Sequence, residues 1–423
     1  MLKKFILNNG LRVLLFPMEN TEAVTLLFLA ATGSKYETKN ISGISHLLEH
    51  LLFRGIKSYP EPGSISRALD EIGGFYNAFT DKEVLGIIFK AGVENLSLIS
   101  KILTEMVTVP LLDKKELIKE KKVVVEEISM REDNPQILIL DLWETLLYGD
   151  QPAGWLVIGS RKTVSSISQK NLSDHLKSSF TAKNSVLAIA GNIKEKDVIK
   201  MVKRDFSVLP GKKRFQKKSV KENQNKPEIM LHFKKTDQTH LCLGVRTVGI
   251  SAFSEKKYVL AVIASLLGGM MSSRLFVEVR ERRGLAYYIR TSCEHYTDSG
   301  YLVTHAGLNN EKVMEAIEII CREYQRLKME RVGDQELAKA KENLRGRLRL
   351  GLETSDSFAS FFGLQELIDG KVLTPSQQWQ KIAKITPDDI LKVAKEVFRA
   401  ENLNVALIGP QRQEKEIRNI LKI

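Results

Sequence analysis

The sequence predicts an α+β protein with two homologous domains, each a mostly antiparallel sheet packed with helices. The chain has 423 residues, which is too long for one ordinary hydrophobic core. The second half also repeats the first: an apolar strand ending in small residues is predicted at 23–34 and again at 240–251. Length and repetition together indicate two copies of one folding unit.

The order of elements after these strands supports the repeat. An apolar helical stretch follows at 43–55 and at 262–274. A strand, an Ala-Gly turn and an amphipathic helix come next, at 89–103 and at 304–320. Strands do not alternate strictly with helices within either half, which favours antiparallel pairing over a doubly wound parallel sheet.

A polar, basic segment bounded by prolines separates the two copies. It reads LPGKKRFQKKSVKENQNKP, and its composition is typical of an exposed linker. We therefore expect a first domain over 1–209, a linker over 210–227 and a second domain over 228–423.

Composition limits the classes of function. The formal net charge is +13, but the basic residues are scattered and no phosphate-binding loop or nucleic-acid module accompanies them. We interpret the charge as a lysine-rich surface and expect no nucleic-acid partner. The three cysteines are far apart and form no CxxC pair, so a reducing compartment fits better than a disulfide framework.

The N-terminal sequence is interpreted as strand–turn–strand rather than as a signal peptide, because Asn8, Asn9 and Gly10 interrupt its apolar run. The longest apolar stretch, at 23–32, is too short to span a bilayer. We expect a soluble, cytoplasmic protein that does not interact with membranes.

The stretch GISHLLEH places two histidines four positions apart, with a glutamate just before the second. We expect a helix over 42–54 with Ser42 as its N-cap, so that His46 and His50 lie on one face, one turn apart. Two such imidazoles can bind one metal ion, and Zn²⁺ prefers nitrogen ligands of this kind. Glu49 borders the same face, where a carboxylate can take a proton from a water molecule at the metal.

The alternative is a pair of buried structural histidines. It would bury three polar groups without ligands, at a cost of several kcal/mol. The order H-x-x-E-H is moreover the inverse of the common H-E-x-x-H zinc motif. The corresponding stretch of the second half has no histidine, so one zinc ion per chain is predicted.

A catalytic zinc site usually takes three protein ligands. The remaining histidines are isolated in the sequence, so a carboxylate is expected as the third ligand. The stretch EKKVVVEEISMREDNP is predicted to be a helix with two adjacent glutamates. Glu126 shares a face with lysines, whereas Glu127 shares one with Glu120 and valines. We therefore prefer Glu127 as the ligand, with Glu126 as the alternative, and Glu120 as a supporting carboxylate that orients the site.

These motifs resemble the pitrilysin/insulinase family of zinc peptidases. The similarity is greatest to its short two-domain members, such as the bacterial peptidasomes and the mitochondrial processing peptidase subunits. GISHLLEH resembles the zinc helix of the family, and VVVEEISMREDNP resembles its third-ligand helix. The segment MSSRLFVEVRERRGLAYYI is similar to a signature of the second domain. The resemblance covers nearly the whole chain, with no departure at a zinc-site position.

The resemblance implies a zinc-dependent endopeptidase of the inverted H-x-x-E-H type. Glu49 would act as the general base and then as the acid toward the leaving amine. Arg280 and Tyr287 of the second domain would orient the substrate carbonyl and stabilise the tetrahedral intermediate. Asn77 and Ala78, in the strand after the zinc helix, would contact an extended substrate.

The family also implies a partner, because its members enclose peptides or unfolded segments in a clamshell chamber built from four such repeats. We therefore expect a homodimer or a heterodimer with an inactive paralogue. The alternative function is a non-catalytic structural subunit of the same fold in a heterodimeric processing peptidase. Intact His46, Glu49, His50 and Glu127 favour the peptidase.

Overall fold

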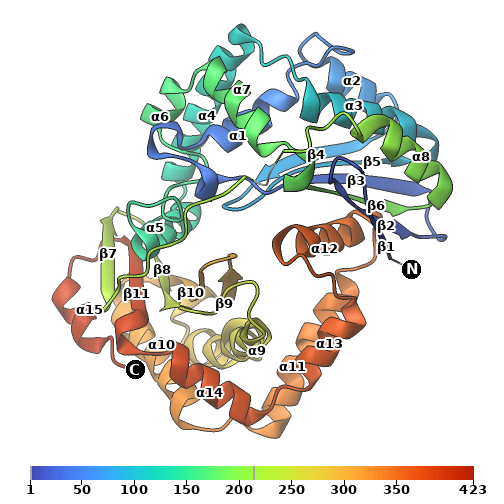
Figure 1. Ribbon diagram of the computed structural model, residues 1–423. Coiled ribbons are helices and arrows are strands. Elements are labelled where there is room, and N and C mark those ends of the chain that lie inside the picture. The colour runs from blue at the N-terminus through green and yellow to red at the C-terminus, as the bar shows by residue number, and fades with distance from the viewer. Residues whose placement is uncertain (1, 213–214) are drawn as a thin grey trace. The chain divides into compact units, whose positions relative to one another are not determined.

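The computed structural model describes residues 2–212 and 215–423 (Figure 1). Its contacts divide the chain into two compact units, each made of three segments. Unit 1 contains the residues up to 129 together with 155–218 and 351–372. Unit 2 contains 130–154, 219–350 and 373–423.

Unit 1 is built on a six-stranded sheet with the order β1-β2-β6-β3-β5-β4. In this order the strands are Lys3–Ile6, Arg12–Pro17, Ser185–Gly191, Ala23–Ala30, Leu85–Gly92 and Phe75–Thr80. All neighbours are antiparallel except β2 and β6, which are parallel. Strand β4 pairs only with β5 among the described residues, so β4 is an edge strand.

Helices cover both faces of this sheet (Figure 1). One face carries α1, α3 and α8, and the other carries α12. The alternation of side chains along β3 explains the two cores: Val24, Leu26 and Phe28 belong to the first, and Leu27 and Leu29 to the second. The helices of unit 1 are α1 Ile44–Leu52, α2 Ser64–Asp70, α3 Leu96–Thr108, α6 Arg161–Ser166, α7 Gln169–Ser179, α8 Glu195–Phe206 and α12 Ser355–Ile368, with most of α4 Lys114–Asp133.

Unit 2 repeats this design with a five-stranded sheet in the order β7-β11-β8-β10-β9. In this order the strands are Glu228–Phe233, Leu403–Gly409, Gln238–Arg246, Gly300–Asn309 and Ala286–His295. The parallel pair β7/β11 takes the place of β2/β6, and the other neighbours are again antiparallel. The predicted α+β fold with two homologous domains is therefore confirmed.

The helices of unit 2 also lie on both faces of its sheet. The larger core holds side chains of α9, α10 and α14, whereas α5 packs on the opposite face against β8 and β11. The helices are α5 Pro135–Tyr148, α9 Lys256–Gly268, α10 Val313–Met329, α11 Asp334–Leu350, α13 Pro375–Ala383, α14 Pro387–Val397 and α15 Glu414–Ile420, with a π-helical turn η5 at Phe276–Glu281.

Two helices belong to the unit built mainly from the other half of the chain. Helix α5 comes from the first half but packs in unit 2, and α12 comes from the second half but packs in unit 1. The expected domains over 1–209 and 228–423 are each continuous in sequence, so they do not account for the exchange of α5 and α12. Within the expected linker over 210–227, residues 213–214 lie outside the described part. The chain passes there from unit 1 to unit 2 between residues 218 and 219.

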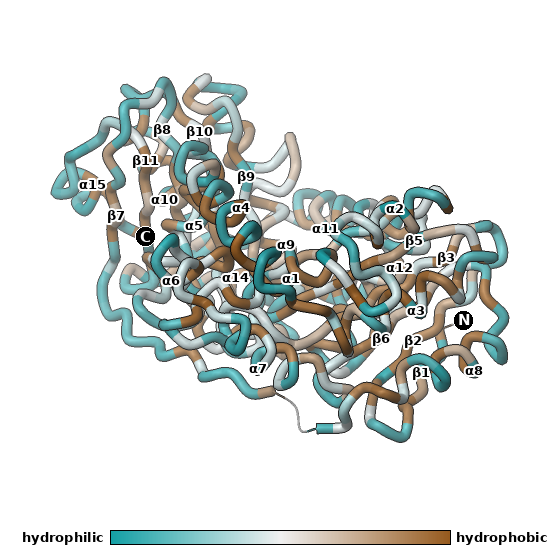
Figure 2. Tube along the Cα trace, turned by 90° about the horizontal axis from the view of Figure 1, so that it is seen from above, coloured by the Kyte–Doolittle hydropathy of each residue, from teal (hydrophilic) through white to brown (hydrophobic). Residues whose placement is uncertain are grey.

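Hydropathy follows the layers of each unit. Figure 2 shows hydrophobic segments along the strands, β6 in particular, and hydrophilic segments in the outer loops. The strand β6 is buried at every position. In the described part of the chain, no helix combines the length and the apolar character needed to cross a membrane.

Candidate metal and catalytic site

Helix α1 carries the H-x-x-E-H motif, and it begins at Ile44, one residue later than a cap at Ser42 would place it. The N-cap is Gly43, whose φ of 93° is left-handed, and the expected cap Ser42 lies outside the helix. No side chain of the cap residue bonds to the first turn. Instead the buried Glu37 accepts the backbone N–H groups of Gly43 at 2.7 Å and Ser45 at 2.9 Å. The expectation of Ser42 as N-cap was wrong: Gly43 is the N-cap, and Glu37 accepts N–H groups that a cap side chain would otherwise bind.

The two histidines project from the side of α1 opposite its leucines. Leu47, Leu48 and Leu51 are buried in the core of unit 1. The side chains of His46 and His50 remain 18% and 16% exposed, with their ring centres 4.7 Å apart. Burial of the leucine face fixes the rotation of the helix and so directs both imidazoles to the same side.

Glu127 of α4 approaches both rings. Its Oε2 lies 3.8 Å from Nε2 of His46 and 3.6 Å from Nε2 of His50. Ligand atoms about 2.0–2.1 Å from a tetrahedral zinc ion are about 3.3–3.4 Å apart, so small shifts of these side chains would accommodate the ion. The neighbouring Glu126 is exposed. The two nitrogens and one oxygen therefore fit a divalent cation in both chemistry and spacing.

Glu120 holds His50 from the opposite side. Its Oε2 lies 3.1 Å from Nδ1 of His50, and its Oε1 lies 2.7 Å from Nε of Arg54. Burial opposes the charge of Glu120, but the hydrogen bond to His50 and the charge of Arg54 outweigh it and lower the pKa of the carboxyl. An ionised Glu120 accepts the Nδ1–H group, which leaves the Nε2 lone pair of His50 facing Glu127.

The same surroundings act on His50. Burial disfavours its charged form, but the hydrogen bond to Glu120 and the charges of Glu127 and Glu49 exceed that effect and raise its pKa. This excess of negative charge around the imidazoles is the charge distribution that a bound cation would balance.

Glu49 is fixed by the end of the edge strand β4. The Oγ1 of Thr80 donates a hydrogen bond of 2.5 Å to Oε2 of Glu49. Burial raises the pKa of Glu49, and the hydrogen bond from Thr80 and the charge of His50 only partly offset this. A carboxylate with a raised pKa is a better proton acceptor than an ordinary surface glutamate.

Asn77 and Ala78 lie in the middle of β4. Tyr76, Ala78 and Thr80 share the face of α1, whereas Asn77 points to the face of α12. The Oδ1 of Asn77 accepts the backbone N–H group of Ala78 at 2.9 Å. The C-terminal end of β4, at Thr80, thus lies beside Glu49.

Comparison with known proteins decides the family. Residues 12–159 match the family model described as Insulinase (Peptidase family M16), and residues 166–344 match the Peptidase M16 inactive domain. The chain belongs to the insulinase family of peptidases. His46, Glu49, His50 and Glu127 all lie in the region that matches the first of these models.

Relatives of this insulinase-family chain match nearly its whole length. An uncharacterized zinc protease of Bacillus subtilis strain 168, YmxG, is 34% identical over 414 residues, which cover 97% of this chain and 98% of the relative. An uncharacterized zinc protease of Rickettsia felis is 30% identical over 404 residues, 96% of each chain. The shared names support a zinc peptidase family.

Solved structures share the fold of this insulinase-family chain. A protease from Helicobacter pylori superimposes with a TM-score of 0.90 at 24% identity, covering 97% of this chain and 99% of the other. A peptidase M16 inactive domain from Pseudomonas fluorescens gives a TM-score of 0.90 at 18% identity, covering 97% and 98%. Both agree with two duplicated α+β units.

Arg280 and Tyr287 belong to unit 2. Arg280 lies in the π-helical turn η5, with its guanidinium 4.8 Å from the ring centre of Phe276. Tyr287 lies near the start of β9 and is 66% exposed. Their part in the reaction stays a prediction from the family resemblance.

Sequence reasoning missed three residues around α1: Glu37, Arg54 and Thr80. Arg54 and Thr80 contact residues far along the chain, whereas Glu37 binds residues six and eight positions away across a loop. Helix and strand periodicity carries no information about either kind of contact. For Arg54 alone a local signal exists, because it follows His50 by one helical turn.

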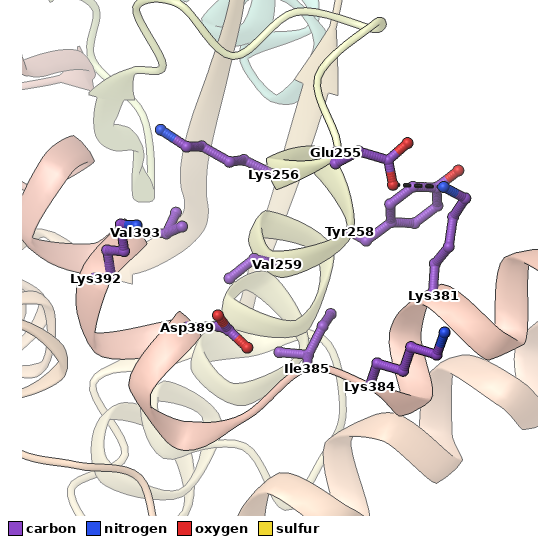
Figure 3. Close-up of a pocket in the computed structure, with 10 residues that line it drawn as sticks. All are labelled: Glu255, Lys256, Tyr258, Val259, Lys381, Lys384, Ile385, Asp389, Lys392 and Val393. Carbon is purple, nitrogen blue, oxygen red and sulfur yellow. Dashed lines mark hydrogen bonds and ion pairs between the residues drawn. The ribbon is translucent and has the colours of Figure 1, made fainter.

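The described residues contain one group of three side chains able to hold a metal ion, which is His46, His50 and Glu127. A cavity of about 420 Å³ lies in unit 2, at the start of α9 and beside α13 and α14. Figure 3 shows the residues that line it. Its carboxylates are already engaged, since Glu255 pairs with Lys381 at 2.6 Å and Asp389 accepts the hydroxyl of Thr386 at 2.8 Å. This cavity offers no second metal site.

Proposed function

We propose that the protein is a zinc-dependent endopeptidase of the inverted H-x-x-E-H type that cleaves peptides or unfolded segments. One observation carries the proposal: Glu127 Oε2 lies within 3.8 Å of the Nε2 atoms of both His46 and His50, with Glu49 fixed on the same helix by Thr80. Family membership and the names of the relatives support the same reaction class.

Zinc is the cofactor that fits best. Two imidazole nitrogens and one carboxylate oxygen are a typical ligand set for catalytic zinc, whereas Mg²⁺ and Ca²⁺ favour oxygen ligands. His46, His50 and Glu127 would hold one ion per chain. When bound, zinc supplies Lewis acidity, which acidifies water and polarises a carbonyl.

Glu49 performs the proton transfers. Thr80 holds Oε2, and Oε1 has no hydrogen bond among the described residues, so Oε1 is the atom that takes the proton from the attacking water. The raised pKa of Glu49 favours this step. The protonated carboxyl then passes its proton to the leaving amine, which restores the carboxylate.

The substrate would add as a strand to the free edge of β4. Backbone hydrogen bonds along Asn77 and Ala78 would hold an extended peptide and exclude segments whose backbone groups are already paired within a folded structure. Arg280 and Tyr287 would orient the carbonyl and stabilise the tetrahedral intermediate, as the family resemblance implies.

We also propose that two chains assemble, either as a homodimer or with an inactive paralogue. A chain with two repeats, and with one metal-binding group among its described residues, would supply half of the four-repeat chamber expected from the family. Light scattering on the purified chain measures the assembly, and a strict monomer with full activity would contradict it.

The test of function is cleavage of unfolded peptides by the purified protein, with and without a chelator. Wild type is expected to cleave, to lose activity with chelator and to regain it with Zn²⁺. E49Q is expected to bind zinc without cleaving, and E127Q to lose zinc. E126Q changes the adjacent exposed carboxylate and should retain both properties.

Two results would overturn the proposal. Cleavage by E49Q at the wild-type rate would remove Glu49 from its role. Zinc bound by a wild-type protein that cleaves nothing would favour the non-catalytic structural subunit.

A further inference from the structure

Glu37 is a buried carboxylate that the reaction itself does not use. It lies in the loop between β3 and α1 and is 4% exposed. Both of its oxygens accept backbone N–H groups from the start of α1: Oε2 from Gly43 and Oε1 from Ser45. The first turn of α1 has no acidic residue and no side-chain cap of its own. Glu37 therefore supplies from outside the helix what a cap residue usually provides.

Burial of the Glu37 carboxylate is energetically unfavourable, so its hydrogen bonds to α1 must replace the hydration that it loses. Burial raises the pKa of Glu37 to about 7, and the hydrogen bonds from Ser45 and Gly43 and the charge of the buried Lys82 offset it only in part. A buried carboxyl is retained where its hydrogen bonds replace those lost with water.

The loop that carries Glu37 is itself anchored to the turn after β4. The backbone N–H of Lys35 donates to the carbonyl of Lys82 at 2.9 Å, and the Lys35 ammonium lies 2.8 Å from Oε1 of Glu83. Thr80, which holds Glu49, ends the strand just before this turn. The loop is therefore held to the turn by a backbone hydrogen bond as well as by this ion pair, so loss of the Glu83 charge alone leaves the loop attached.

His46 is the metal ligand whose position depends most on the structure of the first turn of α1. It is the third residue of the helix, directly after Ser45, whereas His50 lies one turn further on and is held by Glu120. Helix ends lose their structure first when their N–H groups lack acceptors. Loss of the Glu37 hydrogen bonds would therefore displace His46 before His50.

We propose that Glu37 is a positioning residue for the metal site: by binding the N–H groups of Gly43 and Ser45 it fixes the first turn of α1 and brings His46 to the ligand position. This inference rests on the proposed zinc site. Glu37 touches neither metal nor substrate, so its effect passes through the helix.

The experiment measures metal binding directly and compares three variants. Zn²⁺ affinity is measured by competition with a fluorescent chelator, and ligand geometry by the visible spectrum of the Co²⁺-loaded protein. E37A removes both hydrogen bonds, and E37Q keeps one acceptor oxygen in nearly the same volume. E83Q is the matched control, because Glu83 is a buried carboxylate of the turn after β4 that pairs with Lys35 and Lys217 rather than with α1.

E37A is expected to weaken zinc binding by about tenfold or more, as does the loss of other groups that support metal ligands, and to alter the Co²⁺ spectrum. E37Q should fall between E37A and wild type. E83Q should melt at a lower temperature than wild type while keeping its zinc affinity and Co²⁺ spectrum, which separates positioning from plain stability.

Equal zinc affinity and spectra in wild type, E37Q and E83Q would overturn the inference, and E37Q alone decides it if E37A does not fold. An equal loss of affinity in E37Q and E83Q would also overturn it, since the effect would then be general destabilisation. A wild-type protein that binds no zinc would instead refute the proposed function. The two failures are therefore distinguishable.

Discussion

His50 is held between two carboxylates, with Nδ1 3.1 Å from Glu120 and Nε2 3.6 Å from Glu127. The two glutamates lie two turns apart on α4 and contact opposite nitrogens of one ring. Glu120 is nearly buried and paired with Arg54, whereas the Glu127 side chain is 36% exposed. One glutamate therefore suits a fixed orienting role, and the other suits a ligand that faces an accessible site.

The first prediction concerns Glu120. E120Q keeps the shape of the side chain but removes the charge that orients His50 and balances Arg54. We expect zinc affinity to fall about 10- to 100-fold, the usual cost of losing such a support. The measurement is a chelator competition titration. E116Q, which changes a buried glutamate one turn earlier on α4 that pairs with Lys119, should leave the affinity unchanged.

The second prediction concerns Thr80. T80V removes the hydroxyl that fixes Glu49 and keeps the volume. We expect kcat to fall about 10- to 100-fold, in line with the loss of a hydrogen bond to a charged group, with zinc affinity unchanged. The acid limb of the pH–rate profile should also move to higher pH, because the lost hydrogen bond lowers the pKa of Glu49.

T80S retains the hydroxyl and is the control for this series. It should keep most of the activity and the wild-type pH profile. If T80V showed wild-type kcat and profile, the hydrogen bond between Thr80 and Glu49 would have no role in the reaction.

Local sequence patterns predicted the duplicated fold and the placement of the two histidines on one face of α1, because helix and strand periodicity is visible in residues close together in the sequence. The helix face also favoured Glu127 over Glu126, and in the structure Glu127 approaches both imidazoles whereas Glu126 is exposed. Such patterns do not predict which elements pack together when they are far apart in the sequence. The apolar faces of α5 and α12 require burial but do not specify which sheet covers them. The contacts of Glu37 are local, but they cross an irregular loop, so no periodicity indicates that Glu37 would cap α1.

The third prediction is a pH dependence of stability through His175. This histidine is buried, and its Nε2 lies 3.1 Å from Ser45 Oγ and 3.2 Å from Thr32 Oγ1. Burial lowers its pKa from 6.5 to about 4. The unfolded chain therefore binds a proton below pH 6.5 that the folded protein does not, so this contribution to stability is full above pH 6.5 and declines down to about pH 4.

The measurement compares urea unfolding of zinc-free wild type and H175Q at pH 7 and pH 5. Wild type should lose about 2 kcal/mol more of its free energy of unfolding than H175Q over this interval, given about 1.4 kcal/mol per pKa unit. Identical losses in the two proteins would show that His175 does not titrate as its burial requires.

The last prediction tests the exchanged helix α12 through Phe362. This residue is 2% exposed, and its ring centre lies 5.1 Å from that of Phe16 on β2. F362A would leave a cavity between α12 and the sheet of unit 1, so we expect a loss of about 3–5 kcal/mol in the free energy of unfolding. L350A removes a leucine that is 75% exposed and should change stability by less than about 0.5 kcal/mol.

Amide hydrogen exchange locates the effect: F362A should increase exchange in β2, β3 and β6, which lie far from residue 362 in sequence. An increase confined to α12 itself would mean that this helix does not stabilise the sheet on which α1, the helix of the two histidines, packs.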